Sequence, residues 1–538
     1  MKEGFRQSMA WLHTWLGLIV GWLLYFVYLT GTLGYVDREI DYWMTPERPF
    51  FAAPGTPHQQ LALAQTRLQQ VAPGVAAWNI QLLGGREAPS LNIAWTDAPL
   101  TGGSRGVVHR ETLDPRSGLP LGYGPRATGG GQVLYKMHYQ LAYISYDRAI
   151  LFIMVCTVIM FSAMVTGIIA HKNIFKDLFT FRPHKGQRSW LDAHNLLGVT
   201  ALPFHLIVTY SGLLFFTYQF MPAVPNLVYG GGDGARFGLY QTVYPTPAAP
   251  PLPQAAHVVA PLVSLAPLLD QADRLWGPNV ATSVEVRNPG DVNARVLIRQ
   301  RNKLTLQLAE AGLVFDGTSG RLVEDYPGHA VYASGKADEV MKGLHKGLFA
   351  GGPLRVLYVF MGACGTAMIG AGLLLWANKR RTRLLGAGQP VHFGIQLVDR
   401  LNAATLIGVP VAIAAYFWAN RLLPVTLERR AEWEVHAMYL TLAAMFLYAL
   451  TRPPERTRVE MLWLCAAAYA LLPLLNALTT QRHLGHSLAQ GDWVMAGFDL
   501  TSLACGAVAA ACALKVRRSR TTGVALRRRA PQVSSAEI

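Results

Sequence analysis

Two histidines lie inside apolar stretches long enough to cross a membrane, and they occupy matching places. His13 stands in "LHTWLGL" and His194, 181 residues later, in "AHNLLGV". Each is followed by a glycine four residues on and by another eighteen residues on, Gly31 and Gly212. Polar side chains are costly in the bilayer and usually face a bundle interior or a functional site. The repeated spacing therefore indicates that both histidines have the same role in the helix bundle.

A second pair of histidines repeats together with a basic residue. His138 is followed ten residues later by Arg148, and His345 by Arg355. Each pair follows a polar stretch and precedes the next apolar run. The chain thus contains span, domain and span twice, which indicates an internal duplication.

Two further histidines have no histidine at the matching place in the other copy. His205 corresponds to Leu24, and His171 corresponds to Trp376 or Asn378, depending on the alignment. If histidines paired only with their counterparts in the other copy, His205 and His171 would have no partner. The number of histidine-bound groups, two or three, therefore stays open.

The spacing of His194 and His205 predicts their geometry on one helix. Eleven residues make about three turns, so on a straight helix the two side chains share a face about 16 Å apart. Pro203 bends the helix locally and makes this phase approximate. His13 and His171 lie at the depth of His194, so these three are expected to meet on the cytoplasmic side.

Haem is the metal group that this pattern favours. Zinc sites use four close ligands, commonly including cysteine or carboxylate, whereas these histidines are spread over apolar helices. Histidine is a common axial ligand of b-type haem, and the absence of C-x-x-C-H excludes conventional covalent attachment. Arg148 and Arg355 are candidate propionate partners. Four nearby glycines would let a flat macrocycle approach the backbone: Gly17, Gly21, Gly198 and Gly212. In the simpler alternative each histidine only hydrogen-bonds another helix.

Composition places the chain in a membrane. Of 538 residues 51% are hydrophobic and 15% charged, against about 25% charged in soluble domains. Eight segments have or approach the length of about 20 residues that a span needs. They are 11–35, 149–170, 196–221, 356–378, 401–420, 435–451, 461–481 and 493–514, of which the sixth is short and the eighth contains Asp499.

Lysine and arginine in the loops set the orientation. With eight spans, the lysine- and arginine-rich segments fall on one side, so both termini are expected in the cytoplasm. The loop near 421–434 has three arginines balanced by three glutamates. This bias explains most of the net charge of +16, and nucleic acid is not an expected partner. All five cysteines lie in expected spans, so no disulfide framework is implied.

The predicted fold is a mainly α membrane protein with about eight transmembrane helices and two periplasmic α+β domains. Each polar stretch opens with a helical pattern and continues with short alternating segments that end in "DPRSG" or "DGTSG". The predicted parts are a first span (1–36), domain 1 (37–137), spans two and three with a basic loop (138–221), domain 2 (222–344), span four (345–383), spans five to eight (384–515) and a basic tail (516–538).

The chain resembles the PepSY-associated transmembrane-helix family of iron-regulated bacterial inner-membrane proteins. Three stretches carry the resemblance: "WLHTWLGL", "MVTGIIAHKNIFKDLFTFRPHKGQRSWLDAHNLLGVTALPFHLIVTYSGLLFF" and "GLHKGLFAGGPLRVLYVFMGACGTAMIGAGLLLWANKR". The two polar domains resemble PepSY modules, with the turn D-x-x-[ST]-G at 114–118 and 316–320. Residues 1–383 are covered, and the last four spans resemble an extension of longer members.

The resemblance implies a haem-containing reductase of periplasmic ferric siderophores. It implies two, possibly three, haem b groups, held by His13, His138, His171, His194, His205 and His345, without fixing their pairing. Electrons would enter at a cytoplasmic-side haem, pass to an outer haem and reduce Fe(III) to Fe(II). The chain has no G-x-G-x-x-G after a strand and no long cytoplasmic domain for flavin, so the expected donor is a quinol or a separate cytoplasmic reductase.

Two other functions compete with this expectation. The PepSY-like domains could sense or inhibit a periplasmic protease while the histidines only pack. The helix bundle could instead transport haem or an iron chelate. Asp499 is the one clear intramembrane carboxylate, which disfavours an ion-coupled transporter.

Overall fold

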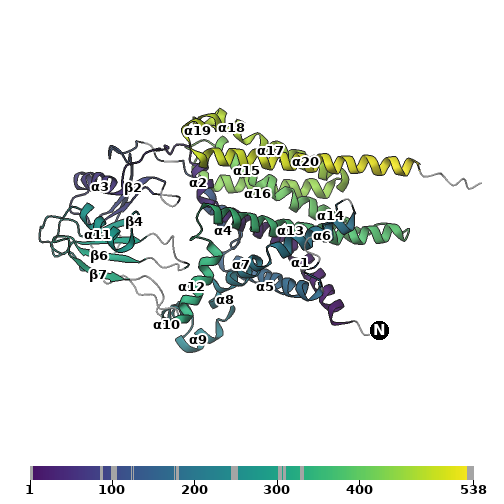
Figure 1. Cartoon of the computed structure of the whole chain (residues 1–538), viewed down its shortest axis with the longest axis horizontal. Helices are drawn as coiled ribbons and strands as arrows, with labels where there is room; N and C mark the ends of the chain where they lie inside the picture. The colour runs from purple at the N-terminus through teal and green to yellow at the C-terminus, as the bar shows by residue number, and fades with distance from the viewer. Residues whose placement is uncertain are drawn as a thin grey trace, which may run out of the picture. The chain divides into compact units, whose positions relative to one another are not determined.

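The computed structural model describes residues 4–529, apart from 85, 87–88, 99–105, 123, 125, 172, 175, 177–180, 184, 244–251, 301–305, 307–310 and 327–331. Figure 1 shows its helices and strands. The chain divides into two compact units, each assembled from separate stretches. The membrane unit comprises Met1–Pro46, Arg126–Leu206 and Tyr358–Ile538, and the sheet unit comprises Glu47–Pro125 and Ile207–Leu357.

Within the described residues, seven helical stretches are long and apolar enough to cross a membrane, and a bent helix pair makes an eighth. The prediction of a mainly helical membrane protein with about eight spans is confirmed. Single helices form five of the seven: α1 (Phe5–Gly34), α5 (Tyr146–Ala170), α13 (Gly352–Gly386), α16 (Arg430–Thr451) and α20 (Trp493–Arg529). The other two join α14 (Phe393–Leu406) to α15 (Gly408–Leu422) and α17 (Pro454–Ala470) to α18 (Leu472–Thr479).

The bent pair consists of α6 (Gln187–Thr200) and α7 (Leu202–Leu214), which meet at 67°. Pro203 is the second residue of α7; proline lacks an amide proton and disfavours helical geometry at the preceding residue. His194 and His205 lie on opposite sides of this bend. The straight-helix estimate, in which they share one face three turns apart, therefore does not hold.

The described residues of the membrane unit also form three short helices: α2 (Asp37–Met44), α4 (Gly130–Lys136) and α19 (Leu484–Gln490). Trp43 of α2 and Leu134 of α4 are fully buried in one core with Met438 of α16. The intramembrane carboxylate of Asp499 is also buried, and it accepts hydrogen bonds from Trp43 Nε1 (2.9 Å) and Asn476 Nδ2 (3.1 Å). These donors explain why a span tolerates an aspartate.

The described residues of the sheet unit form one seven-stranded antiparallel sheet, to which both predicted polar domains contribute strands. The strands are β1 (Ala77–Gln81), β2 (Leu91–Thr96), β3 (Val108–Leu113), β4 (Ala281–Arg287), β5 (Arg295–Gln300), β6 (Gly312–Asp316) and β7 (Leu322–Tyr326). Their order is β3-β2-β1-β4-β5-β6-β7. The strands of the two polar stretches meet at β1 and β4, where Ile80 lies opposite Val284.

Two helices share the core of this sheet, α3 (Pro57–Val71) and α11 (Ala266–Trp276). The start of α3 follows from its sequence: Thr56 caps it by accepting a hydrogen bond from the amide of Gln59 (3.2 Å), and Pro57 takes the first turn. The other helices of the unit are α8 (Thr217–Phe220), α9 (Ala223–Tyr229), α10 (Asp233–Val243) and α12 (Ala333–Lys346).

The same turn closes both strand groups. The carboxylate of Asp316 accepts hydrogen bonds from the amides of Thr318 (3.1 Å) and Ser319 (2.9 Å), and Asp114 makes the equivalent bond with Ser117 (3.2 Å). The closing glycines both have φ of +72°, which glycine adopts without strain. Burial raises the pKa of Asp316, but these hydrogen bonds outweigh it and lower the pKa to about 2.

Candidate functional site

The membrane unit brings two of the repeated histidines together. The rings of His13 on α1 and His194 on α6 have centroids 6.0 Å apart and planes inclined by 64°. A metal–imidazole bond of about 2 Å on each side, plus about 1 Å from nitrogen to ring centre, places two imidazoles on one ion about 6 Å apart. The observed separation fits two imidazoles that share one metal ion.

Each of the two rings packs on a neighbouring helix in the same way. We call the place that holds each ring its seat: a carbonyl that accepts the Nδ1 proton and a glycine four residues later. His13 donates from Nδ1 to the carbonyl of Ala163 on α5 (2.7 Å), and His194 donates from Nδ1 to the carbonyl of Met368 on α13 (2.9 Å). Four residues after each carbonyl comes a glycine against which the ring packs. A Cβ on Gly167 would lie 3.0 Å from the ring of His13, and one on Gly372 would lie 3.1 Å from that of His194. The duplication thus extends to how each ring is held.

His205 on α7 is the most buried of the six histidines, with 1% of its surface exposed. Its Nδ1 is hydrogen-bonded to the hydroxyl of Tyr28 on α1 (3.3 Å). A Cβ on Gly365 of α13 would lie 2.8 Å from its ring. Its Nε2 is buried and has no hydrogen-bond partner among the described residues. Because an unpaired buried nitrogen costs free energy, its lone pair is a candidate metal ligand.

His138 follows α4 directly and packs on α1. Its Nδ1 donates to the carbonyl of Tyr135, and a Cβ on Gly31 would lie 3.6 Å from its side chain. Burial lowers the pKa of His138 to about 4, so the ring is neutral at physiological pH. A neutral imidazole is the form that binds metals.

His345 lies in the sheet unit and repeats the arrangement of His138. A Cβ on Gly212 would lie 3.3 Å from its ring, and Gly212 stands eighteen residues after His194 as Gly31 stands eighteen after His13. The hydroxyl of Ser211 donates to the carbonyl of Ile207, so its oxygen accepts from Nδ1 of His345 (3.0 Å). The repeated histidine-to-glycine spacing therefore has a structural reason: each distal glycine receives the histidine that begins the next apolar segment.

Five of the six rings form a hydrogen bond through Nδ1. Metal-bound histidines characteristically form such a bond with one ring nitrogen and bind the metal through the other. His171 differs. Its Nε2 accepts a hydrogen bond from the amide of Asn195 (2.9 Å), and its Nδ1 is buried without a partner among the described residues. The lone pair of His171 Nε2 therefore already accepts a hydrogen bond from Asn195, the residue that follows His194.

The two repeated arginines do not share one environment. Arg148 is exposed at the start of α5. Arg355, near the start of α13, is half-buried and donates to the carbonyl of Ala350 (2.7 Å). Neither observation assigns a propionate to these arginines, so that role stays a prediction.

The glycines that meet histidine rings are mostly not those the sequence suggested. Of the four expected, Gly212 lies against His345, but Gly21 faces Leu373, Gly198 faces Met368, and a Cβ on Gly17 would meet nothing within 4 Å. The rings are instead received by glycines on neighbouring helices, which spacing along one helix does not reveal. These are Gly31, Gly167, Gly365 and Gly372.

A basic and aromatic cluster near the His13–His194 pair was missed by the sequence analysis. The guanidinium of Arg380 lies 3.8 Å from the ring centroid of Trp376 and 5.5 Å from that of Trp15. Trp15 is two residues from His13, and Trp376 is four residues from Gly372, the seat of His194. An arginine four residues after a tryptophan at the end of an apolar helix is the sequence signal for this cation–π contact.

The comparisons with known proteins agree with this architecture. Residues 10–379 match the family described as the PepSY-associated TM region. No curated protein matches the chain. The matched region contains all six histidines and ends before α14, so the last helices lie outside it. This multi-pass membrane chain belongs to the PepSY-associated transmembrane family.

Proposed function

We propose that this protein binds haem b and passes electrons through its membrane unit to a ferric chelate. The observation that carries the proposal is the His13–His194 pair, in which both rings donate Nδ1 to a carbonyl and lie 6.0 Å apart. His13 and His194 would each offer one imidazole nitrogen to the iron of a bound haem, which would supply the redox chemistry. A bound haem iron would carry one electron at a time.

His205 and His138 supply the nitrogens for a second site. Both contact α1, where Tyr28 and Gly31 are three residues apart, less than one helical turn. The buried, unpartnered Nε2 of His205 supports a ligand there. His345, in the sheet unit, is a separate candidate ligand, since its Nδ1 is also hydrogen-bonded. The apolar helices around these rings exclude water, which helps set the reduction potential.

The proposed substrate class rests on the family resemblance and on the chemistry of iron. Hard oxygen ligands of a siderophore hold Fe(III) far better than Fe(II), so one-electron reduction releases the ion. We place this reaction on the periplasmic side of a bacterial inner membrane. A quinol that gives two electrons and releases two protons would reduce two ferric ions, and a cytoplasmic reductase is the other possible donor.

The test begins with the detergent-purified protein. We expect a low-spin b-type absorbance spectrum, and haem quantification should give at least two haems per chain. His13→Ala and His194→Ala should each lose one haem and the ferric-chelate reductase activity while the protein still inserts. His392→Ala is the matched control, because His392 is an exposed histidine of the same unit. A colourless wild-type protein from haem-supplied cells would overturn the proposal.

A further inference from the structure

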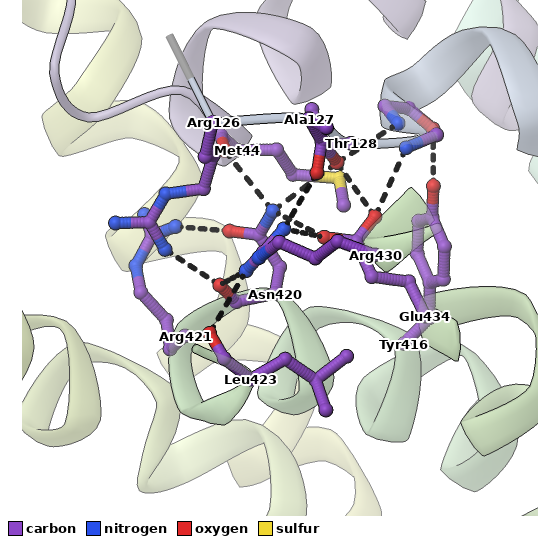
Figure 2. A network of polar contacts seen from close by, with 12 residues as sticks. Met44, Arg126, Ala127, Thr128, Tyr416, Asn420, Arg421, Leu423, Arg430 and Glu434 are labelled. Carbon is purple, nitrogen blue, oxygen red and sulfur yellow. Dashed lines mark hydrogen bonds and ion pairs between the residues drawn. The ribbon is translucent and has the colours of Figure 1, made fainter. Parts of the chain in front are cut away.

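The last helices of the chain hold the start of α4, the helix that leads directly into His138. Figure 2 shows the contacts, which join residues 126–130 to α15 and α16. The carboxylate of Glu434 accepts hydrogen bonds from the hydroxyl of Thr128 (2.6 Å) and the amide of Gly129 (3.0 Å). The hydroxyl of Tyr416 donates to the carbonyl of Gly130 (2.9 Å). Both side chains come from helices outside the family-matched region.

A buried ion pair fixes the carboxylate that makes these contacts. Arg430 and Glu434 are both fully buried, and Arg430 Nη1 donates to Glu434 Oε1 at 2.5 Å. The same arginine donates to the carbonyl of Ala127 (2.8 Å), and Asn420 Nδ2 donates to Glu434 Oε1 (2.8 Å). Because Asn420, Arg430 and Glu434 are fully buried, the hydrogen bonds among these three side chains are costly to lose.

The glycine run "TGGGQ" is shaped for this close approach. A Cβ on Gly129 would lie 2.6 Å from the hydroxyl of Tyr416. Gly130 has φ of +60°, and a Cβ there would clash with the carboxylate of Asp41 on α2. Gly131 donates its amide to that carboxylate (2.7 Å). Larger residues would push this segment away from its partners.

The same helix, α16, also holds the chain after His138. The hydroxyl of Tyr143 is hydrogen-bonded to Nδ1 of His436 (2.6 Å), and its ring lies 5.3 Å from that of Tyr439. Met137, directly before His138, is buried in the core that contains Met438 of α16. Helix α16 therefore contacts this segment before the histidine, through Glu434, and after it, through His436 and Tyr439.

We propose that the C-terminal helices α15 and α16 form a brace, made by Tyr416, Glu434 and His436, that sets the position of His138 against α1. Glu434 is a positioning residue, because it acts on His138 through α4. The part of this inference that concerns haem rests on the proposed function. The brace itself is a property of the polypeptide and can be measured without haem.

The test uses the full-length protein and three variants. Glu434→Gln removes the charge of the brace, Tyr416→Phe removes a single hydroxyl, and Glu432→Gln is the control. Glu432 lies on the same helix but pairs with Arg429 at the surface. Hydrogen exchange of peptides covering 126–140 should be about tenfold faster or more in the first two variants. It should be unchanged in Glu432→Gln and in peptides covering α6.

A spectroscopic measurement links the brace to His138. The low-spin signal that His138→Ala abolishes should shift in Glu434→Gln, while the signal that depends on His13 stays unchanged. Tyr416→Phe keeps the test valid if Glu434→Gln does not fold. Unchanged exchange at 126–140 in both brace variants would overturn the brace. Faster exchange combined with no effect of His138→Ala on the haem spectrum would support the brace and refute His138 as a ligand.

Discussion

Two histidine sites of the membrane unit are built in different ways. His13 and His194 sit in seats that repeat each other, each with a carbonyl and a glycine four residues later on the neighbouring helix. His138 has a glycine seat on α1, but its own segment is held by helices that the duplication does not contain. The comparison indicates that the duplication accounts for how His13 and His194 are held, whereas the segment of His138 also depends on contacts with helices outside the duplication.

The largest expected effect concerns the two ion pairs of α16, of which Arg430–Glu434 is buried and Arg429–Glu432 is exposed. Glu434→Leu leaves the Arg430 guanidinium buried without its carboxylate counter-charge, so we expect the free energy of unfolding to fall by about 3–5 kcal/mol. Glu432→Leu breaks the surface pair with Arg429 and should change it by less than about 1 kcal/mol. Thermal unfolding in detergent measures both. Equal changes in the two variants would show that the buried pair does not stabilise this region.

The second prediction tests whether the two repeated seats are equivalent. Gly167→Val and Gly372→Val would force side chains against the rings of His13 and His194, with an overpacking cost of about 1–3 kcal/mol each. We expect both to lower haem retention by a similar factor of about ten. Gly17→Val is the control, because a Cβ there meets nothing within 4 Å. If only one of the two seats responds, the rings do not share one iron.

The repeated turn of the sheet unit gives a pH-dependent prediction. The folded pKa of Asp316 is lowered to about 2, so its carboxylate stabilises the fold above the unfolded value near 4 and loses this contribution as the pH falls toward 2. Asp316→Asn should therefore lower the free energy of unfolding by about 1–2 kcal/mol at pH 6 and by much less near pH 2. Unfolding of the two proteins across this range tests the sign. A difference that grows on acidification would contradict it.

The smallest expected effect concerns the hydroxyl at His205. Tyr28→Phe removes the hydrogen bond to Nδ1 and should shift the redox equilibrium of the haem that depends on His205 by about 1 kcal/mol or less. Potentiometric titration measures this shift. Tyr25→Phe is the matched control on the same helix, because the hydroxyl of Tyr25 bonds the carbonyl of Leu406 instead. An equal shift in both variants would assign the effect to general packing.

The sequence predicted most of the membrane fold and the residues of the His13–His194 pair. Apolar runs of about 20 residues mark spans directly, and the matched offsets of Gly31 and Gly212 revealed the duplication. It did not predict the pairing of β1 with β4, because strand contacts between segments 200 residues apart leave no local pattern. The 67° bend at Pro203 also exceeded the local bend expected there.

The brace was hidden for a different reason. In the sequence, the charges near 421–434 balance and are typical of a solvated loop. In the structure, Arg430 and Glu434 are fully buried, while Arg429 and Glu432 face solvent. The packing of α15 and of the segment at the start of α4 against α16 distinguishes the two pairs, and it is visible only in three dimensions. The role of the last helices could not be inferred for the same reason.

The most direct test of the central claim is an electron paramagnetic resonance spectrum of the oxidised protein. Two imidazoles on one ferric haem with planes inclined by 64° should give a strongly anisotropic low-spin signal. His13→Ala and His194→Ala should each abolish that same signal, whereas His392→Ala should leave it intact. If the two variants abolish different signals, or neither abolishes one, His13 and His194 do not ligate a common haem.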